Sequence, residues 1–564
     1  MYQPQLNQLT RAEELFDAGK LDKALEILND WSQFEGLNPQ QKNHYQFLKG
    51  LILIYQNKSE ELIELGEQLF KEGQKCKDNL QSFDGLFFII TGLVLATNFD
   101  ETFKLIEKAE TLLRLTSTRS KNILIQKEIR ISLLKAMINL EIGNIDLAEK
   151  CLEWILSSQK EPPNTFEIVW AKILMARIML QVKSRFDLAL EYTKKASSLA
   201  KEIKFNHFWI ALSHLVFGGI YSCIGEFDIS LKHAMKSLAV FKEIKNNWYI
   251  GILLNNIGLM YGDKGEYDLA LENFEESLIL FEQIPYKGIY NIEPQIDGLI
   301  SVSLEKGDVE RAQKYFHRLE NIFNQSSKRQ YTDQVHAQKK DTQLELVYQY
   351  CKALMLKRSS RIRDKAKAEE LLKQVIETET LFFDIIIKAY IHLCDLLLAE
   401  FRINNDSEVL DELNHYIAKL LTIAEKSHSY LIFCETFILQ AKLALISFDV
   451  KAARRFLTQA QKIAEFYGIK RLAMKISYKH DELIRQLKMW EKLKESEASL
   501  TERWELAGLK EQMDHMVKKR MIEAPKISEE DPISIFIITE GGIPLFSHSF
   551  IKEKSFESHL FGGF

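Results

Sequence analysis

Residues 256–281 read NIGLMYGDKGEYDLALENFEESLILF, and this stretch decides the fold. Small and apolar residues recur in it at helical spacing on both sides of Gly265 and Glu266. The pattern predicts two short antiparallel helices joined by a tight turn. The residues that define it are Gly258, Tyr261, Gly265, Tyr267, Ala270, Phe274 and Ser277.

The same unit recurs from near the N-terminus to about residue 465, with mostly 38 to 46 residues between successive turns. The predicted turn positions are Gly19, Asn57, Thr97, Gly143, Ser184, Gly225, Gly265, Gly307, Arg363, Asn405 and Phe448. Five residues after each turn, a small or apolar side chain is expected where the two helices touch, since small side chains allow close approach. These residues are Ala24, Leu62, Thr102, Ala148, Ala189, Ser230, Ala270, Ala312, Ala368, Leu410 and Ala453.

Glycine and asparagine at these turns have a physical reason, because the end of a helix often needs a left-handed backbone that other residues adopt at a steric cost. The series predicts an all-α fold, a right-handed superhelical solenoid of about eleven helix pairs. Such an array can extend over all 564 residues as one structure, since each unit packs only on its neighbours.

The unit resembles the tetratricopeptide repeat family at Gly258, Tyr261, Gly265-Glu-Tyr267, Ala270 and Phe274, and the preceding unit repeats this pattern in register. The family's nominal period is 34 residues, whereas this chain has about 40. It is therefore similar to the long-helix variety of kinesin-light-chain-like and MalT-like arrays. The resemblance implies that the first helix of each pair lines a concave groove that binds a protein or peptide segment.

The repeat pattern divides the chain into segments. Residues 1–323 are predicted to form about eight helix pairs, 324–343 a polar connection, and 344–467 further pairs. Residues 468–524 are predicted to form one long helix, either a cap on the last repeat that continues outward or a coiled-coil arm that dimerises the protein.

Residues 531–564 change period and predict two strands, at 533–538 and 543–550, followed by the start of a helix. Such a hairpin is too small to be stable alone, so we expect either a chain that is cut short or a hairpin that borrows a partner. The segment resembles the first part of the roadblock/longin-type modules of archaeal signalling proteins. This resemblance implies an archaeal protein that associates with a small GTPase or with itself.

The net charge of −5 and a pI near 6.3 give no electrostatic reason to expect specific nucleic-acid binding. Residues 357–367, KRSSRIRDKAK, are locally basic and indicate either a solvated loop or an anionic contact. Six scattered cysteines without a CxxC pair predict reduced thiols in a cytoplasmic protein. The sequence predicts neither a secretory signal nor a membrane span.

Motifs of catalysis are not found in the sequence. It contains no phosphate-binding GxxxxGK[ST] loop, no dinucleotide-binding GxGxxG after a strand, and no HExxH zinc motif. His207, His214 and His233 come closest to a metal-binding group, but within predicted helices they are expected to be core or surface residues. We therefore expect no enzyme activity, no cofactor and no metal site.

By the resemblance, the predicted groove is lined by Leu133, Met137, Leu174, Ile178, Leu215, Gly219, Asn255, Leu259 and Asp263. Several of these could instead pack against adjacent units. Asn255 and Asn256 are the polar exceptions, because a side-chain amide can both donate to and accept from a peptide backbone. The predicted partner-binding residues are Leu215, Gly219, Asn255, Asn256, Leu259 and Asp263.

These observations favour a non-enzymatic scaffold or adaptor that holds a partner segment in its groove. The alternative is a signalling regulator whose repeats are coupled to a C-terminal module that associates with a small GTPase. A third hypothesis, a MalT-like transcriptional regulator, requires an ATPase or a helix-turn-helix, and neither is found.

Overall fold

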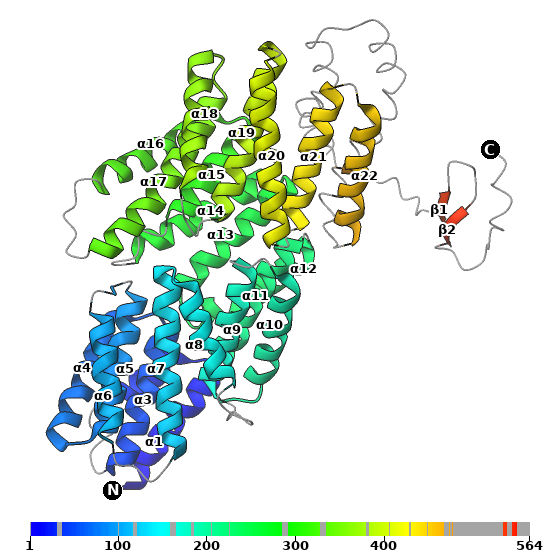
Figure 1. Cartoon of the computed structure of the whole chain (residues 1–564). Coiled ribbons are helices and arrows are strands. Elements are labelled where there is room, and N and C mark those ends of the chain that lie inside the picture. The colour runs from blue at the N-terminus through cyan, green and yellow to red at the C-terminus, as the bar shows by residue number, and fades with distance from the viewer. Residues whose placement is uncertain are drawn as a thin grey trace, which may run out of the picture. The chain divides into compact units, whose positions relative to one another are not determined.

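The computed structural model of the chain describes residues 2–30, 37–96, 98–99, 101–116, 121–157, 165–181, 185–204, 206–224, 226–284, 292–326, 334–378, 383–404, 406–427, 430–447, 449–466, 473, 476–477, 534–538 and 544–549. Within these residues the chain forms 22 helices that follow one another as eleven pairs (Figure 1). The predicted all-helical repeat architecture and its number of pairs are therefore confirmed.

The first helices of the pairs are α1 (Tyr2–Asp17), α3 (Pro39–Tyr55), α5 (Asn79–Leu95), α7 (Lys121–Ile142), α9 (Phe166–Gln181), α11 (His207–Ile224), α13 (Asn247–Lys264), α15 (Glu293–Lys306), α17 (Gln334–Lys357), α19 (Phe383–Asn404) and α21 (Tyr430–Ile446). The second helices are α2 (Leu21–Asn29), α4 (Ser59–Cys76), α6 (Thr102–Arg114), α8 (Ile145–Ser157), α10 (Phe186–Ala200), α12 (Phe227–Glu243), α14 (Tyr267–Gln283), α16 (Val309–Ser326), α18 (Ile362–Glu377), α20 (Ser407–Ser427) and α22 (Val450–Phe466).

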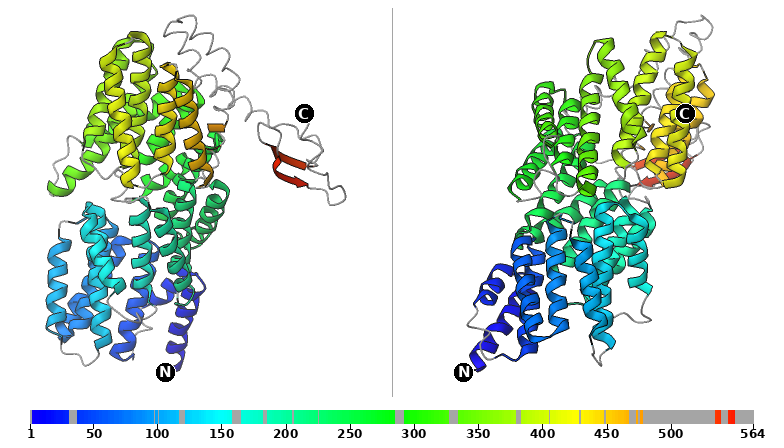
Figure 2. Two further views of the ribbon diagram at one scale, coloured as in Figure 1. Left: turned by 45° about the vertical axis from the view of Figure 1, so that its right-hand side comes forward. Right: turned by 60° about the vertical axis from the view of Figure 1, so that its left-hand side comes forward.

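The two helices of a pair lie side by side, and each pair packs on the next one along the chain (Figure 2). Each odd-numbered helix also contacts the odd-numbered helix of the next pair. Among the described residues, even-numbered helices come less close to one another. We therefore call the odd-numbered helices the inner helices and the even-numbered ones the outer helices.

The turns within the pairs have the predicted backbone geometry. Gly265 ends α13 with a φ of 80°, and its N–H bonds to the carbonyl of Gly262. A side chain with a Cβ adopts this left-handed conformation at a cost, which explains the glycine. Positive φ angles recur at Gly19, Asn57, Gly143 and Gly307.

Neighbouring pairs repeat the same hydrogen bonds at positions that are 40 residues apart in the sequence. Ser237 of α12 donates its hydroxyl hydrogen to the carbonyl of Ala211 at 2.7 Å, and Ser277 of α14 donates to the carbonyl of Gly251 at 2.7 Å. Both hydroxyls are buried and paired, as buried polar groups need to be. The repeat is thus a repeat of contacts as well as of sequence.

The core is formed where inner and outer helices meet. Small residues at the predicted contact position are fully buried, among them Ala148, Ala189, Ala270 and Ala368. One continuous apolar cluster extends from Leu9 in α1 to Met260 in α13. The first six pairs and α13 therefore share a single core, which positions the inner helices described below.

Two predicted boundaries are wrong. The polar connection predicted at 324–343 is shorter, because α16 continues to Ser326 and α17 begins at Gln334. Glutamine, lysine and alanine are good helix formers, so helix continues there without the apolar periodicity on which the prediction relied. The turn predicted at Arg363 lies inside α18, since the preceding turn already ends at Arg361, the N-cap residue of that helix.

The chain divides into two compact units, residues 1–507 and 508–564. In the second unit, β1 (Ser534–Ile538) pairs antiparallel with β2 (Pro544–Ser549), and the pairing is irregular at Ile538. The rest of this unit lies outside the described residues, and so does the long helix predicted at 468–524 apart from residues 473, 476 and 477. The roadblock/longin-type module and the coiled-coil arm stay predictions.

Candidate partner-binding face

Ion pairs link inner helices that belong to three successive pairs in the N-terminal half. Arg130 of α7 contacts Asp84 of α5 at 3.1 Å and Glu167 of α9 at 2.7 Å. The guanidinium lies 4.2 Å from the centroid of the Phe47 ring, within cation–π range. Lys127 also pairs with Asp84, and burial lowers the pKa of Lys127 despite this partner.

A second set of ion pairs links the inner helices of the C-terminal half. Asp395 of α19 accepts hydrogen bonds from Lys357 of α17 at 3.4 Å and from Lys442 of α21 at 3.2 Å. Asp297 of α15 and Lys388 of α19 approach to 3.7 Å. In both halves, charged side chains thus join inner helices of successive pairs, and the Asp297–Lys388 pair also joins α15 to α19, two pairs farther along.

Between these two sets of ion pairs, aromatic contacts join the inner helices α11 and α13. The ring centroids of Phe208 and Tyr249 are 5.7 Å apart. Burial raises the pKa of Tyr249, and the charges of Arg177 and Glu141 act on it with opposite signs. The six predicted partner-binding residues lie in this part of the array.

The structure places the six predicted partner-binding residues on α11 and α13. Leu215 and Gly219 are one helical turn apart on α11, and both are half-buried. Asn255 and Asn256 are half-buried on α13, where Leu259 follows and is 43% exposed. Asp263 lies in the last turn of α13, but its side chain is outside the described residues.

The remaining predicted groove residues lie in two environments. Leu133, Leu174 and Ile178 are buried in the core, which agrees with the alternative prediction that several groove residues pack against adjacent units. Met137 is partly buried against the same core. The apolar stripes of α7 and α9 thus serve mainly for packing, whereas α13 keeps an exposed leucine.

The amide of Asn255 is only partly available. Its Oδ1 atom is enclosed by protein and makes no hydrogen bond within the described structure. An Oδ1 atom enclosed in this way is not placed to accept a hydrogen bond from a partner backbone, as the prediction from the sequence requires.

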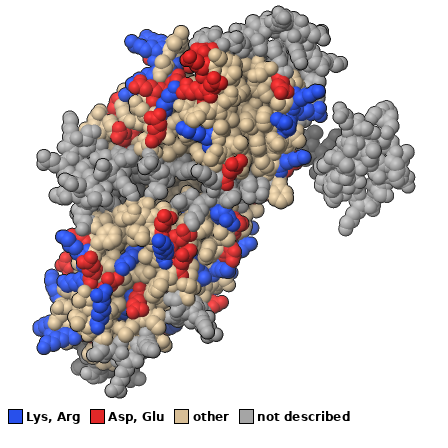
Figure 3. Space-filling view, viewed as in Figure 1, with Lys and Arg blue, Asp and Glu red and all other residues tan. Residues whose placement is uncertain are grey.

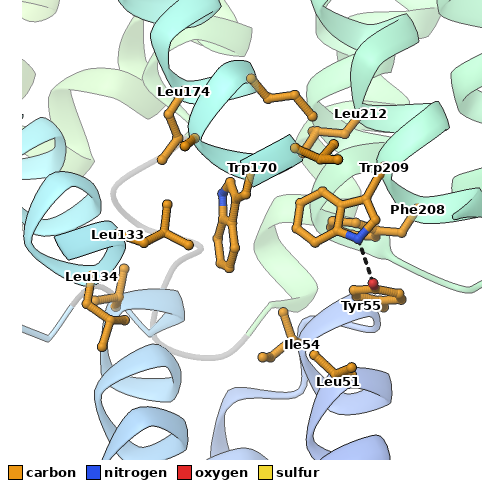
Figure 4. Packing of buried hydrophobic residues seen from close by; sticks show 14 of the residues in the cluster. Leu51, Ile54, Tyr55, Leu133, Leu134, Trp170, Leu174, Phe208, Trp209 and Leu212 are labelled. Carbon is orange, nitrogen blue, oxygen red and sulfur yellow. Dashed lines mark hydrogen bonds between the residues drawn. The ribbon is translucent and has the colours of Figure 1, made fainter. Parts of the chain in front are cut away.

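A contact between N-terminal and central helices is not visible in the sequence. The indole N–H of Trp209 in α11 donates to the hydroxyl of Tyr55 in α3 at 2.7 Å, and Phe208 stacks on the Tyr55 ring at 4.3 Å. Figure 4 shows these side chains directed toward one another from different helices, with Trp170 beside them. Burial raises the pKa of the Tyr55 hydroxyl, so it stays protonated.

Polar contacts extend this junction. The side-chain amide of Asn246, the N-cap residue of α13, donates to the carbonyl of Tyr55 at 2.7 Å. Lys245 pairs with Asp22 at 2.5 Å and lowers the pKa of that carboxyl. His207 bonds to the carbonyl of Asp17 at 2.9 Å. The N-terminal helices therefore hold the beginnings of α11 and α13 in place.

The other predicted features have structural roles. In the basic run 357–367, Lys357 bonds to Asp395, and Arg358 donates to the carbonyl of Leu304 at the end of α15 at 2.8 Å. His214 and His233 face each other, with 2.8 Å between their Nδ1 atoms.

In the described part of the chain, no three His, Cys, Asp or Glu side chains are arranged to hold a metal ion. None of the described helices has the length and apolar character needed to cross a bilayer.

The geometry defines the class: the chain is an all-helical repeat protein of tetratricopeptide-like architecture, with eleven pairs related by a translation of about 40 residues. No protein-family model and no curated protein match the sequence. Among solved structures, a Rap protein complexed with competence and sporulation factor is 15% identical, with a TM-score of 0.46 over 72% of this chain and 99% of that one. NprR in complex with its cognate peptide NprX is 14% identical, with a TM-score of 0.43 over 68% and 97%. Yeast Tom70 is 13% identical, with a TM-score of 0.35 over 86% and 96%.

Proposed function

We propose that this chain is a non-enzymatic adaptor that binds a segment of another protein on the exposed face of α11 and α13. The observation that carries the proposal is the exposure of Leu259. Among the described side chains of the inner helices, only Leu259 and Ile123 are large, apolar and exposed, and Ile123 lies at the start of α7. Because single exposed apolar side chains are common on protein surfaces, the proposal depends on the position of Leu259 beside the half-buried amides of Asn255 and Asn256 on an inner helix.

Two further features support this proposal. The ion pairs on either side of α11 and α13 hold the inner helices in one arrangement, and a preformed surface loses little entropy on binding. The half-buried amides of Asn255 and Asn256 lie one turn and almost one turn before Leu259, where they can fix the register of an extended or helical segment. Burying the exposed part of one leucine contributes about 1 kcal/mol.

The test compares partners captured from an extract of the source cells by the full chain and by its variants. Leu259→Glu is expected to lose the partner, whereas Ile279→Glu on the outer helix α14, where Ile279 is 54% exposed, is expected to keep it. Asn255→Ala is expected to weaken binding about fivefold, the equivalent of about 1 kcal/mol. Equal capture by both glutamate variants would reject the inner-face site.

In this proposal the chain acts by binding, and no residue is assigned a catalytic role. Three of the six cysteines, Cys351, Cys394 and Cys434, are buried free thiols, which supports a reducing compartment such as the cytoplasm. Association of residues 531–564 with a small GTPase or with a second copy is a prediction from the sequence of that segment alone.

A further inference from the structure

The third residue of four consecutive outer helices is a leucine or isoleucine, which is exposed in three of them and partly buried against the core at Leu188. These residues are Leu147 in α8, Leu188 in α10, Ile229 in α12 and Leu269 in α14. Leu147 is 52% exposed, Ile229 and Leu269 are each 40% exposed, and Leu188 is half-buried. Each follows an acidic residue in the local sequences IDLA, FDLA, FDIS and YDLA.

The flanking repeats show that the fold does not require an apolar side chain at this position. Outer helices before α8 carry Lys23, Glu61 and Lys104 as their third residue, and the two after α14 carry Arg311 and Asp364. Single exposed apolar residues are common on protein surfaces. Four in equivalent positions of neighbouring repeats, bounded by charged residues on both sides, form a continuous feature, which we call the outer stripe.

Acidic residues surround the outer stripe. The first nine residues of α8, α10, α12 and α14 together contain nine Asp or Glu and three Lys or Arg. Asp228 and Asp268 are 91% and 76% exposed. Three of the four aspartates in these local sequences already pair, Asp187 with Arg185, Asp228 with Lys264 and Asp268 with Lys306, but ion pairs this exposed are weak and exchange readily. On the face seen in Figure 3, charges of both signs are interspersed.

We propose that the outer stripe binds a basic amphipathic helix of a partner protein. Directly packed helices lie about 10 Å apart, which is a lower limit for the outer helices of successive pairs, and seven residues of an α-helix rise by about 10 Å. A partner helix that crosses the four outer helices can therefore contact each residue of the outer stripe if its own apolar side chains recur every seventh residue. Lysine or arginine beside this seam then faces the aspartates, which complements the acidic border.

The probe is a fluorescein-labelled peptide of about 22 residues, the length needed to cross four outer helices. Its leucines recur every seventh residue and its flanking positions are lysine. An isomer of the same composition has its leucines shuffled. Fluorescence anisotropy with the full chain is expected to give a Kd about tenfold lower for the regular peptide than for the shuffled one.

Variants separate apolar contact from charge attraction. The triple variant Leu147→Glu, Ile229→Glu and Leu269→Glu introduces a residue that α4 carries at the same position, so we expect it to fold, which its thermal unfolding checks. Charge attraction alone predicts tighter binding of the lysine-rich peptide to this variant, whereas an apolar stripe predicts a loss of about tenfold. The control Met235→Glu with Ile279→Glu changes residues on α12 and α14 that are 56% and 54% exposed and lie off the stripe. It is expected to bind the peptide at least as tightly as wild type.

Three outcomes would overturn the proposal. They are equal affinity for the two peptides, tighter binding by the triple glutamate variant, and self-association in sedimentation that the triple variant abolishes. The last result would identify a second copy of this chain as the occupant. Since the outer stripe and Leu259 lie on different helices, loss of one binding activity and retention of the other shows which site has failed.

Discussion

Trp209 and Tyr55 are 154 residues apart in the chain, yet the indole N–H of Trp209 donates a 2.7 Å hydrogen bond to the Tyr55 hydroxyl inside the core. In a simple array each pair contacts only its neighbours. Here α3 of the second pair contacts α11 of the sixth. The N-terminal half is thus a closed structure, and its stability depends on contacts that are distant in sequence.

The first prediction concerns this contact. Tyr55→Phe removes the acceptor and leaves the buried indole N–H of Trp209 unpaired, which is expected to cost about 1–3 kcal/mol of unfolding free energy in urea denaturation. The control is Tyr261→Phe, a half-buried tyrosine on α13, which is expected to cost less than about 0.5 kcal/mol. Equal effects of the two substitutions would show that the hydrogen bond contributes nothing specific.

The second prediction concerns Glu167, whose side chain is 0% exposed. Arg130→Met removes its ion-pair partner and leaves a buried charge, so a loss of about 3–5 kcal/mol is expected. The double variant Arg130→Met with Glu167→Leu is expected to recover most of this loss, because neither charge then remains unpaired between α7 and α9. Lys195→Met breaks the exposed pair with Glu191 and is expected to cost at most about 0.5 kcal/mol. A double variant as unstable as the single one would contradict this account.

The third prediction compares two equivalent glycines. A Cβ on Gly258 would lie 2.9 Å from the ring of Phe274, so Gly258→Ala is expected to destabilise by about 1–3 kcal/mol through overpacking. At Gly218, 40 residues earlier, the nearest atom would be the carbonyl oxygen of Ser230 at 3.5 Å. Gly218→Ala is therefore expected to be neutral or to stabilise the helix by up to about 1 kcal/mol. Thermal unfolding of both variants measures the contrast, and equal destabilisation by the two substitutions would contradict it.

The fourth prediction concerns pH. Burial, the facing His233 and the nearby Lys236 and Lys201 lower the pKa of His214 from 6.5 to about 4. Between these two pH values the His214 imidazole binds a proton in the unfolded chain but not in the folded chain. The free energy of unfolding therefore falls as the pH drops from about 6.5 to about 4. Because His214 is only half-buried, the expected loss is about 1–2 kcal/mol.

The variant His214→Gln is expected to reduce this pH dependence, measured as the urea midpoint between pH 7 and pH 4. The matched control is His317→Gln on α16, where the side chain is 62% exposed. It is expected to leave the slope unchanged. The same slope in all three proteins would assign the acid sensitivity to other groups.

Local features of the fold could be predicted from the sequence, because they depend on residues a few positions apart. The turn at Gly265, the buried Ala270 and the number of pairs belong to this group. The start of α17 at Gln334 could not be predicted, since its first turns lack the apolar spacing of the other units.

The candidate site was predictable only in part. Placement of Leu259 and Asn255 on an inner helix follows from the repeat, but the exposure of Leu259 depends on which side chains of other helices cover it, and the sequence does not show this. The ion pairs of Arg130 and Asp395 were missed because each joins segments about 40 residues apart. The sequence does show a charged side chain on the apolar side of a helix in each case. It does not show which opposite charge on another helix this side chain meets.

The contact of α3 with α11 and α13 also sets the order in which this protein can fold on the ribosome. Tyr55 is synthesised well before Trp209 and Asn246, so its hydroxyl and its carbonyl can bond only to water until those residues are made. At roughly 5–20 residues per second, the delay is about 10–40 s. Most repeat arrays can compact pair by pair as they emerge, but here the earliest helices wait for the middle of the chain.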